Sequence, residues 1–478
     1  MRQKRIMIAA PKSGSGKTMI TCALLKALKN RGEQVVSYKC GPDYIDPMFH
    51  REMIGIPSKN LDTFFTGETK TRELFLCDRK GEECAVIEGV MGLFDGLGGI
   101  CEEGSSYHLA KVTKTPIVLV IDAKGMGRSL LALLSGFLAY DTEYLIKGVI
   151  LNRMSKCYYD TIKPLLEAEL RICVLGYFPE QRELCVESRH LGLTLPGEVA
   201  DIKDKVQVAA AALEETVSIE ELLKIAEGAA ELEGVETAEQ GELRGAACTA
   251  AAESVHPVVS ETEKVHPAIA VARDAAFCFY YEDNLRLLET YGAKLVYFSP
   301  LHDAGLPDGC SGILLGGGYP ELYTEKLAAN VSMLGAICEA IASGVPSVAE
   351  CGGFMYLHET LIDDRGIPHS MVGAIPGGCK NTGKLVRFGY IEVEEKKDSF
   401  LPEGEKIKGH EFHYFDSTEN GSDCVAKKPV TGKTYDCVNA GENHWWGFPH
   451  LYYPSNPEFA RRFVKKAAAF CENHKDKA

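Results

Sequence analysis

Residues 8–18 read IAAPKSGSGKT, an apolar strand that runs into a glycine-rich turn and then into the start of a helix. Backbone N–H groups in such a turn hold phosphate oxygens, and the helix presents its positive end to the same anion. The P-loop pattern G-x-x-x-x-G-K-[ST] is met at Gly16, Lys17 and Thr18, but Pro11 replaces its first glycine and fixes φ there. We therefore predict a nucleotide site in which Lys17 reaches the β- and γ-phosphates and Thr18 faces Mg²⁺.

Two further residues of this turn belong to the predicted nucleotide site. Lys12 lies five residues before Lys17, where a subgroup of P-loop ATPases carries an extra lysine, and Gly14 lies between them. The alternative is a glycine-rich turn that binds no ligand.

Composition limits the class of protein. A chain of 478 residues predicts two or three domains, and 45% apolar and 25% charged residues are typical of a soluble globular protein. The net charge of −15 argues against nucleic acid or an anionic membrane as the main partner. No apolar stretch is long enough to span a membrane and no signal peptide is visible, so we expect a cytoplasmic protein. Its 17 cysteines include no C-x-x-C pair, which favours reduced thiols.

Four acids follow two apolar strands near the P-loop. Asp43 and Asp46 stand on the loop after the strand at 34–40, and Glu88 ends the strand at 84–88, followed by Asp95. An acid at the carboxyl end of a parallel strand beside a P-loop can hold Mg²⁺ directly or through water. The alternative is that these are solvated loop acids.

Further strands alternate with helices, which predicts a doubly wound parallel sheet with ligands at the carboxyl ends of its strands. Asn152 follows one such end, where its amide could read the edge of adenine. The expected elements are strand 116–122, helix 129–139, strand 147–151, helix 158–170, strand 173–178 and one or two helices within 203–228. The first predicted domain is 1–228, and 229–266, rich in Ala, Glu, Gly and Thr, is the predicted linker.

A second α/β domain is predicted over 267–478. Its expected elements are strand 268–272, helix 282–291, strand 294–298, strand 312–315, the loop GGGYPE at 316–321, helix 328–343 and strand 347–350. The last strand turns at Cys351 into two glycines, which is typical of a nucleophile elbow.

Cys351 is thus distinguished from the other cysteines by its position. The N–H groups of Gly352 and of Gly317 and Gly318 are candidates for an oxyanion hole. A thiol needs a base, and the best candidate is His450, in GFPHLYY. The alternative is a packed core thiol.

Motifs along nearly the whole chain resemble those of the cobyrinic acid a,c-diamide synthase family. They are the P-loop with GPDYIDP at 41–47, EGVMGLFDG at 88–96, RHLGL at 189–193, ARDAAF at 272–277, GGGYPE at 316–321, ECGG at 350–353 and GHEFHY at 409–414.

This resemblance implies a two-site amidotransferase with L-glutamine, ATP and cobyrinic acid as substrates. An amino-terminal domain similar to dethiobiotin synthetase would use MgATP to phosphorylate carboxylates of a corrin ring. A carboxyl-terminal class I glutamine amidotransferase domain would release ammonia through a thioester on Cys351, with His450 as base. The family's pattern also implies that Asp43 and Glu88 support the metal and that Asp46 and Asp95 line the acceptor site.

Other residues are expected near the acceptor, which carries many carboxylates. They are Arg189, His190, Arg273, Tyr280, His410 and His413. For the two histidines of GHEFHY the alternatives are zinc ligands or ordinary structural histidines, and for Tyr280 the alternative is helix packing. One departure from the family concerns the base: many class I glutaminases have Glu two residues after the catalytic His, but here Tyr452 stands there, which leaves the orienting partner of His450 open.

Three other functions stay open. A ParA-like ATP-dependent switch would use the P-loop but leave the Cys351 domain without a role. Cobyric acid synthase and nickel-sirohydrochlorin a,c-diamide synthase share the architecture and differ in acceptor. The oligomeric state stays open between monomer and homodimer.

Overall fold

The computed structural model describes four stretches of the chain, and it divides into two compact units, 1–244 and 245–478. The described residues are 3–77, 83–180, 202–232 and 266–475. Most of the predicted linker 229–266 lies outside them, as do Arg189 and His190, so the predicted domain bounds and these two site residues stay predictions.

The first unit is built on a seven-stranded parallel sheet with the order β3-β2-β4-β1-β5-β6-β7. The strand that leads into the P-loop therefore lies at the centre of the sheet, and the predicted doubly wound parallel sheet is confirmed. The strands are β1 Arg5–Ala9, β2 Val35–Cys40, β3 Ser58–Leu61, β4 Cys84–Glu88, β5 Ile117–Asp122, β6 Ile146–Asn152 and β7 Cys173–Phe178.

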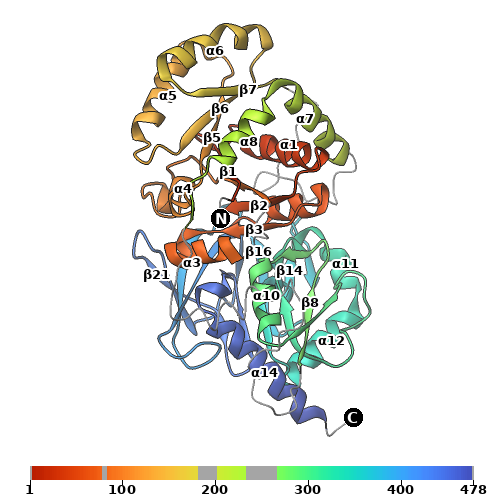
Figure 1. The fold of residues 1–478 in the computed structure, drawn as a ribbon. Coiled ribbons are helices and arrows are strands. Elements are labelled where there is room, and N and C mark those ends of the chain that lie inside the picture. Colours follow the sequence, from red (N-terminus) through yellow and green to blue (C-terminus); the bar gives the residue numbers. More distant parts are fainter. Residues whose placement is uncertain (1–2, 78–82, 181–201, 233–265, 476–478) are drawn as a thin grey trace. The chain divides into compact units, whose positions relative to one another are not determined.

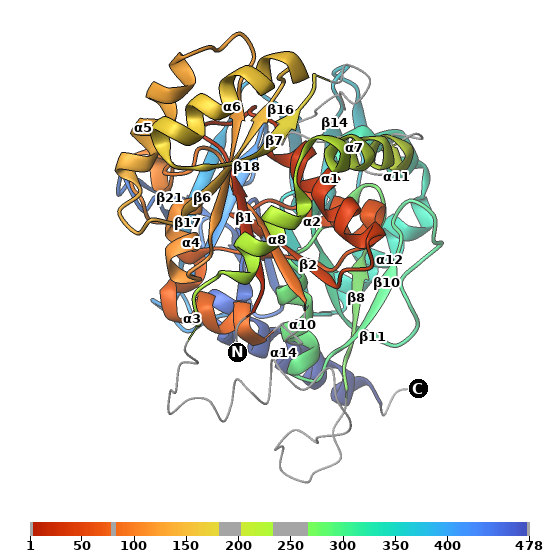
Figure 2. The same ribbon diagram turned by 45° about the horizontal axis from the view of Figure 1, so that its top comes forward.

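Helices cover both faces of this sheet. Its crossovers run one way from β1 to β2 and the other way from β4 through β7, and right-handed crossovers in opposite directions place their helices on opposite faces. Figures 1 and 2 show α1 beside α7 and α5 beside α6. The helices are α1 Lys17–Asn30, α2 Ile45–Phe49, a π-helix His50–Ile54, α3 Thr63–Cys77, a 3-10 helix Leu97–Gly99, α4 Ser106–Val112, α5 Ser129–Tyr140, α6 Lys156–Leu170, α7 Ile202–Thr216 and α8 Ile219–Glu227.

The second unit has a six-stranded sheet with the order β10-β8-β11-β13-β23-β22, parallel except for the last pair. Because β13 ends at Glu350, Cys351 comes at the carboxyl edge of this sheet. The strands are β8 Ala268–Ala272, β10 Lys294–Phe298, β11 Cys310–Leu315, β13 Ser347–Glu350, β22 Asn439–Ala440 and β23 His444–Gly447.

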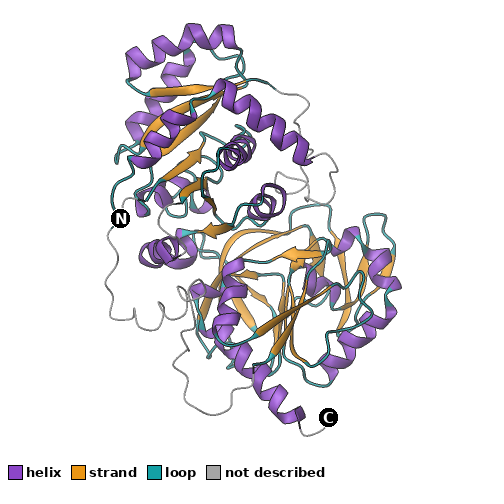
Figure 3. Ribbon diagram, turned by 45° about the vertical axis from the view of Figure 1, so that its right-hand side comes forward, coloured by secondary structure: helices purple, strands orange, loops and turns teal. Residues whose placement is uncertain are grey.

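Three smaller sheets complete the second unit. Figure 3 shows helices of this unit on the outside of its strands. A five-stranded antiparallel sheet, β21-β20-β17-β18-β24, carries both the GHEFHY motif and His450. The strands are β9 Phe277–Phe279, β12 Gly317–Gly318, β14 His358–Ile362, β15 Pro368–Ser370, β16 Ile375–Asn381, β17 Arg387–Glu395, β18 Lys406–His413, β19 Phe415–Ser417, β20 Cys424–Lys427, β21 Thr434–Cys437 and β24 His450–Leu451.

One predicted helix of the second unit is wrong in its extent. The expected helix 328–343 is two helices that meet at Asn330, whose side chain accepts a hydrogen bond from the N–H of Met333 at 3.4 Å and so starts a new helix. The helices are α10 Glu282–Thr290, a 3-10 helix Pro320–Leu322, α11 Thr324–Ala329, α12 Val331–Ala342, α13 Gly352–Tyr356, a 3-10 helix Tyr453–Ser455 and α14 Glu458–Lys475.

Two general features follow from the described residues. None of their helices combines the length and the apolarity needed to cross a membrane. Their 15 cysteines are all free thiols, as the sequence predicts.

Candidate active sites

The glycine-rich turn has the backbone geometry that its sequence predicts. Gly14 and Gly16 have φ values of 76° and 93°, and Gly16 caps α1 from the left-handed region. The Asn152 amide donates to the Ser15 carbonyl at 2.8 Å, and a methyl group built on Gly16 would overlap this amide. Asn152 therefore braces the turn, and its predicted contact with adenine stays a prediction.

Lys17 is a buried cation held over the turn by carbonyl groups. Its Nζ donates to the Met91 carbonyl at 2.5 Å and lies 3.5 Å from the Lys12 carbonyl, while the Lys12 side chain is exposed. Burial, together with the charge of Lys39, lowers the pKa of Lys17 to about 8. A polyphosphate would offset both effects, because it brings negative charge to the ammonium group.

The acids predicted beside the P-loop come together around a lysine. The Thr18 hydroxyl donates to Glu88 Oε1 at 2.7 Å, and Lys39 Nζ lies 2.9 Å from the same oxygen. Lys39 also donates to Asp46 Oδ2, and Asp43 Oδ2 lies 3.8 Å from its Nζ. Nothing in the local sequence marks Lys39 as a site residue, although it comes directly before Cys40 and the GPDYIDP loop.

The charged groups of this cluster shift one another's pKa values. Burial raises the pKa of Glu88, and burial together with Asp46 raises the pKa of Asp43. Burial opposes ionisation of Asp46, but the Lys39 ammonium outweighs it and lowers the pKa of Asp46. Burial likewise opposes the charge on Lys39, but the acids outweigh it and keep its pKa above the ordinary value. Added positive charge would therefore stabilise the ionised acids.

The oxygen atoms of this cluster fit Mg²⁺. Within the described chain, Glu88 Oε2 is shielded from solvent and has no hydrogen-bond partner, with His50 Nε2 at 3.5 Å. No group of three His, Cys, Asp or Glu side chains among the described residues is arranged to hold a metal ion by itself. Mg²⁺ needs no such cage, because it usually binds one or two carboxylates together with water and phosphate oxygens.

Asp95, predicted to line the acceptor site, lies on the loop that follows β4. Its side chain is exposed, and its Oδ2 accepts a hydrogen bond from the Gly92 N–H at 3.1 Å. It therefore stays accessible to a ligand near the P-loop, and its role at the acceptor stays a prediction.

A pocket of about 610 Å³ lies past the carboxyl ends of β5, β6 and β7. Its lining includes Met126, Met154, Tyr158 and Pro179, which offer apolar surface suited to a planar base. Arg153 lines it too and donates to Asp122 Oδ1 at 2.8 Å. This pocket is the best candidate in the described part of the first unit for the nucleoside end of ATP.

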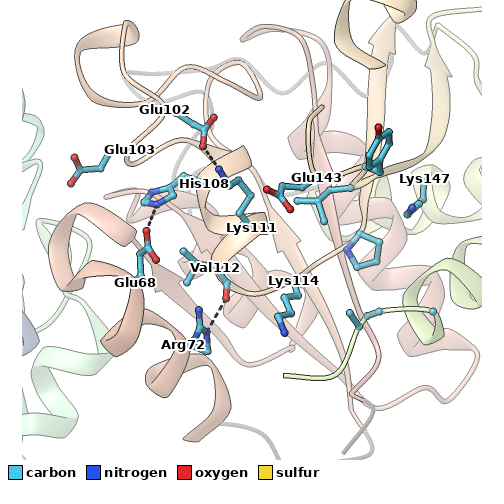
Figure 4. Close-up of a pocket in the computed structure, with 16 residues that line it drawn as sticks. Glu68, Arg72, Glu102, Glu103, His108, Lys111, Val112, Lys114, Glu143 and Lys147 are labelled. Atoms are coloured by element: carbon cyan, nitrogen blue, oxygen red, sulfur yellow. Dashed lines mark hydrogen bonds and ion pairs between the residues drawn. The ribbon is translucent and has the colours of Figure 1, made fainter. Parts of the chain in front are cut away.

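A second pocket, of about 770 Å³, lies near the amino ends of β5 and β6 (Figure 4). Several of its charged side chains pair with one another: Lys111 lies 2.9 Å from Glu102, and His108 lies 3.2 Å from Glu68. It faces away from the P-loop edge of the sheet, so we assign it no part in the chemistry.

In the second unit, Cys351 is the apex of a strained turn between β13 and α13. Its φ and ψ are 46° and −100°, a conformation that an L-residue rarely adopts. Its N–H donates to the Gly447 carbonyl at 2.8 Å, which fixes the apex to the neighbouring strand. This is the geometry of a nucleophile elbow.

The predicted oxyanion glycines lie against this apex. A methyl group built on Gly352 would lie 3.0 Å from the Gly318 nitrogen, and one built on Gly317 would overlap the His450 ring. The N–H of the next residue, Gly353, is not available to an oxyanion because it donates to the Gly316 carbonyl at 2.9 Å. Gly317, Gly318 and Gly352 stay the candidates.

Glu350 is the best candidate for the orienting partner of His450, which the sequence left open. Glu350 Oε2 lies 4.0 Å from His450 Nδ1, whereas the Tyr452 hydroxyl donates to Asp283 at 2.7 Å. Burial raises the pKa of Glu350 to about 8. The sequence did not reveal this pairing, because the acid directly precedes the nucleophile instead of following the histidine.

Burial favours the neutral forms of both the Cys351 thiol and the His450 imidazole. Burial, followed by the Glu321 carboxylate, raises the pKa of the Cys351 thiol well above its usual range. Burial, followed by His413, lowers the pKa of His450 to about 3, so its imidazole is uncharged at neutral pH.

This charge state predicts how the thiol reacts with iodoacetamide. Because the pKa of Cys351 is raised, its thiolate fraction at neutral pH is small, and the alkylation rate should rise about tenfold per pH unit from roughly pH 6.5 to 8.5. Peptide mass spectrometry measures this rate, with the exposed Cys157 as internal reference. A plateau below pH 8 would instead indicate a thiolate–imidazolium pair.

The structure places four predicted acceptor residues in the second unit, in two different settings. Arg273 is exposed at the end of β8, with its guanidinium 5.2 Å from the ring centre of Tyr297. Tyr280 braces the glycine loop: its hydroxyl accepts from the Gly316 N–H at 2.8 Å and donates to the Ala272 carbonyl.

The two histidines of GHEFHY are buried next to the candidate base. His410 stacks on His450 with ring centres 4.9 Å apart, and His413 stacks on Phe448 at 4.0 Å. The contacts of these two histidines and of Tyr280 favour a role in supporting the Cys351 site. They lend no support to the acceptor role expected for the three residues, which stays a prediction.

These two sites define an ATP-dependent glutamine amidotransferase. Residues 6–192 match the family model described as a CobQ/CobB/MinD/ParA nucleotide binding domain, and residues 268–447 match a CobB/CobQ-like glutamine amidotransferase domain. The protein is a glutamine-hydrolysing ligase, which excludes a ParA-like switch without catalytic activity.

The chain belongs to the cobyrinate a,c-diamide synthase family. It is 36% identical over 468 residues to the cobyrinate a,c-diamide synthase of Caldanaerobacter subterraneus subsp. tengcongensis, which covers 97% of this chain and 98% of that protein. The synthase of Listeria monocytogenes serovar 1/2a is 39% identical over 461 residues, covering 95% of this chain and 97% of the relative. That of Priestia megaterium is 34% identical over 481 residues, covering all of both chains.

Proposed function

We propose that this enzyme amidates the a and c side-chain carboxylates of cobyrinic acid, with ATP and glutamine as cosubstrates, as a step of cobalamin biosynthesis. The observation that carries the proposal is that one chain of this family holds both sites. Its P-loop places Thr18 against Glu88, and its strained Cys351 is followed by Gly352, which packs against Gly317 and Gly318. We place the enzyme in the cytoplasm, where ATP and glutamine are supplied and thiols stay reduced.

The first reaction activates the acceptor. A carboxylate oxygen attacks the γ-phosphorus of ATP, the bond to ADP breaks, and an acyl phosphate forms. Lys17 stabilises the charge on the transferred group. Bound through Thr18, Glu88 and Asp43, Mg²⁺ would neutralise phosphate charge. Ammonia then attacks the acyl carbon, and phosphate leaves in place of the far poorer oxide leaving group.

The second reaction supplies the ammonia. His450 takes the proton from Cys351 as Sγ attacks the side-chain amide carbon of glutamine, and Glu350 orients the imidazole. N–H groups of Gly317, Gly318 and Gly352 stabilise the oxyanion. The proton passes from His450 to the leaving nitrogen, ammonia departs, and water hydrolyses the thioester to glutamate.

The acceptor can be tested directly. Purified enzyme with MgATP and glutamine should convert cobyrinic acid into a product with two added amides, with a monoamide appearing first, because the two carboxylates must be activated one at a time. Mass spectrometry of a time course measures both species. If cobyrinic acid is inert while nickel-sirohydrochlorin gains two amides, or if cobyrinic acid a,c-diamide is the substrate instead, the acceptor assignment is wrong and the two-site chemistry stands.

A further inference from the structure

The GGGYPE loop ends in an acid that the chemistry above does not use. Glu321 lies in the 3-10 helix Pro320–Leu322, directly after the glycines of the candidate oxyanion hole. Within the described chain, its Oε2 is shielded from solvent and has no hydrogen-bond partner. Burial, followed by the charge of Asp364, raises the pKa of Glu321 to about 8. Glu321 as a whole is half-buried, but this one shielded oxygen lacks the hydrogen bonds that water would give it, and a cationic ligand could supply them.

Glu321 belongs to the Cys351 site. A methyl group built on Gly352 would lie 2.9 Å from Pro320 Cδ, so the start of this 3-10 helix packs against the residue that follows the nucleophile. Glu321 follows this proline directly, and after burial its negative charge is the next cause that raises the pKa of the Cys351 thiol.

The basic residue of the neighbouring loop is already paired. Arg365 Nη2 lies 2.9 Å from Asp363 and 2.5 Å from Glu325, whereas Asp364, between Asp363 and Arg365, adds a further negative charge near Glu321. With Arg365 already paired, a ligand that brings its own positive charge would stabilise the ionised form of Glu321 beside Asp364.

We propose that Glu321 binds the α-ammonium group of the substrate glutamine and thereby selects an α-amino acid as nitrogen donor. In glutamine, two methylene groups separate the reacting amide carbon from Cα, which bears the ammonium group, so one molecule can reach both the thiol and a nearby carboxylate. A charged hydrogen bond formed there offsets the free energy of burying Glu321. This inference rests on Cys351 as nucleophile and adds the group that positions its substrate.

The test compares Glu321→Gln with wild type, using Glu325→Gln as matched control because Glu325 lies four residues further along the chain, in α11, and is exposed. Glu321→Gln should raise the KM for glutamine about 10- to 100-fold, the range of a lost charged hydrogen bond, with kcat changed less than about threefold. Amidation with high ammonium should stay at the wild-type rate, and Glu325→Gln should match wild type throughout.

A substrate analogue separates recognition from a structural role. Glutaramate is glutamine without its α-amino group, so wild type should hydrolyse it with a kcat/KM at least about tenfold lower than that for glutamine. Glu321→Gln should lose most of this discrimination, because its effect falls on glutamine alone. The proposal is overturned if wild type has the same kcat/KM for glutamine and glutaramate, or if Glu321→Gln lowers both values by the same factor. The comparison of the two compounds with wild type does not depend on whether the variant folds.

The failure of this proposal differs from failure of the nucleophile assignment. If glutamine hydrolysis survives Cys351→Ala, the nucleophile is wrong whatever Glu321 does. If that variant is inactive with glutamine while Glu321→Gln leaves both the KM and the discrimination unchanged, Cys351 stands and Glu321 does not bind the ammonium group.

Discussion

Lys17→Ala should abolish amidation with either glutamine or ammonium as nitrogen donor. The Lys17 ammonium is the buried cation of the glycine-rich turn, held by the Met91 carbonyl at 2.5 Å, and its removal leaves the transferred phosphoryl group without that charge. Loss of a single group that stabilises a transition state costs about 10²- to 10³-fold in rate. Product formation measured by mass spectrometry with each donor gives the effect.

The matched control for this variant is Lys26→Ala, further along the same helix α1, which should stay at the wild-type rate. Alkylation of Cys351 should be the same in both variants, since Cys351 lies in the other unit of the chain. Synthesis by Lys17→Ala at nearly the wild-type rate would remove the nucleotide site from this turn.

Cys351→Ala should eliminate glutamine hydrolysis and glutamine-dependent amidation, while amidation with high ammonium stays largely intact. No thioester can form without Sγ, but the synthetase reaction requires only a nitrogen nucleophile. Glutamate release should fall by at least about 10³-fold, as for other catalytic nucleophiles. Ammonium rescue then shows that the variant is folded at its other site.

Cys338→Ala is the control for general thiol effects, because Cys338 lies on helix α12, away from the turn. It should leave both nitrogen donors effective. Amidation supported by glutamine in Cys351→Ala would contradict the assignment of the nucleophile.

Much of the fold follows from local sequence. The strands Ala268–Ala272, Lys294–Phe298 and Ser347–Glu350 have the predicted bounds, because short apolar runs between turn residues leave little freedom of assignment. The helix break at Asn330 was missed although Asn is a strong helix cap. Its signal was present, but an apolar pattern on both sides concealed it.

The sites were predictable where chemistry is local and not where it depends on packing. The P-loop and the turn at Cys351 each lie within a few consecutive residues. The roles of Lys39 and Glu350 instead come from pairing between strands and between loops, which bring Lys39 to Glu88 and Glu350 to His450. Residue type alone suggested that Arg273 and His413 both bind the acceptor. The structure distinguishes them, because Arg273 is exposed whereas His413 is buried and stacked on Phe448.

The positive φ of Cys351 also bears on how this protein can evolve. A residue held at φ 46° outside glycine stores of the order of 1–3 kcal/mol, and glycine at that position would release much of it. The substitution that most relaxes the turn is therefore one that removes the thiol. Selection for thermal stability alone would favour glycine at this position and so an inactive protein. The cysteine therefore persists only while the cell needs the product of the enzyme.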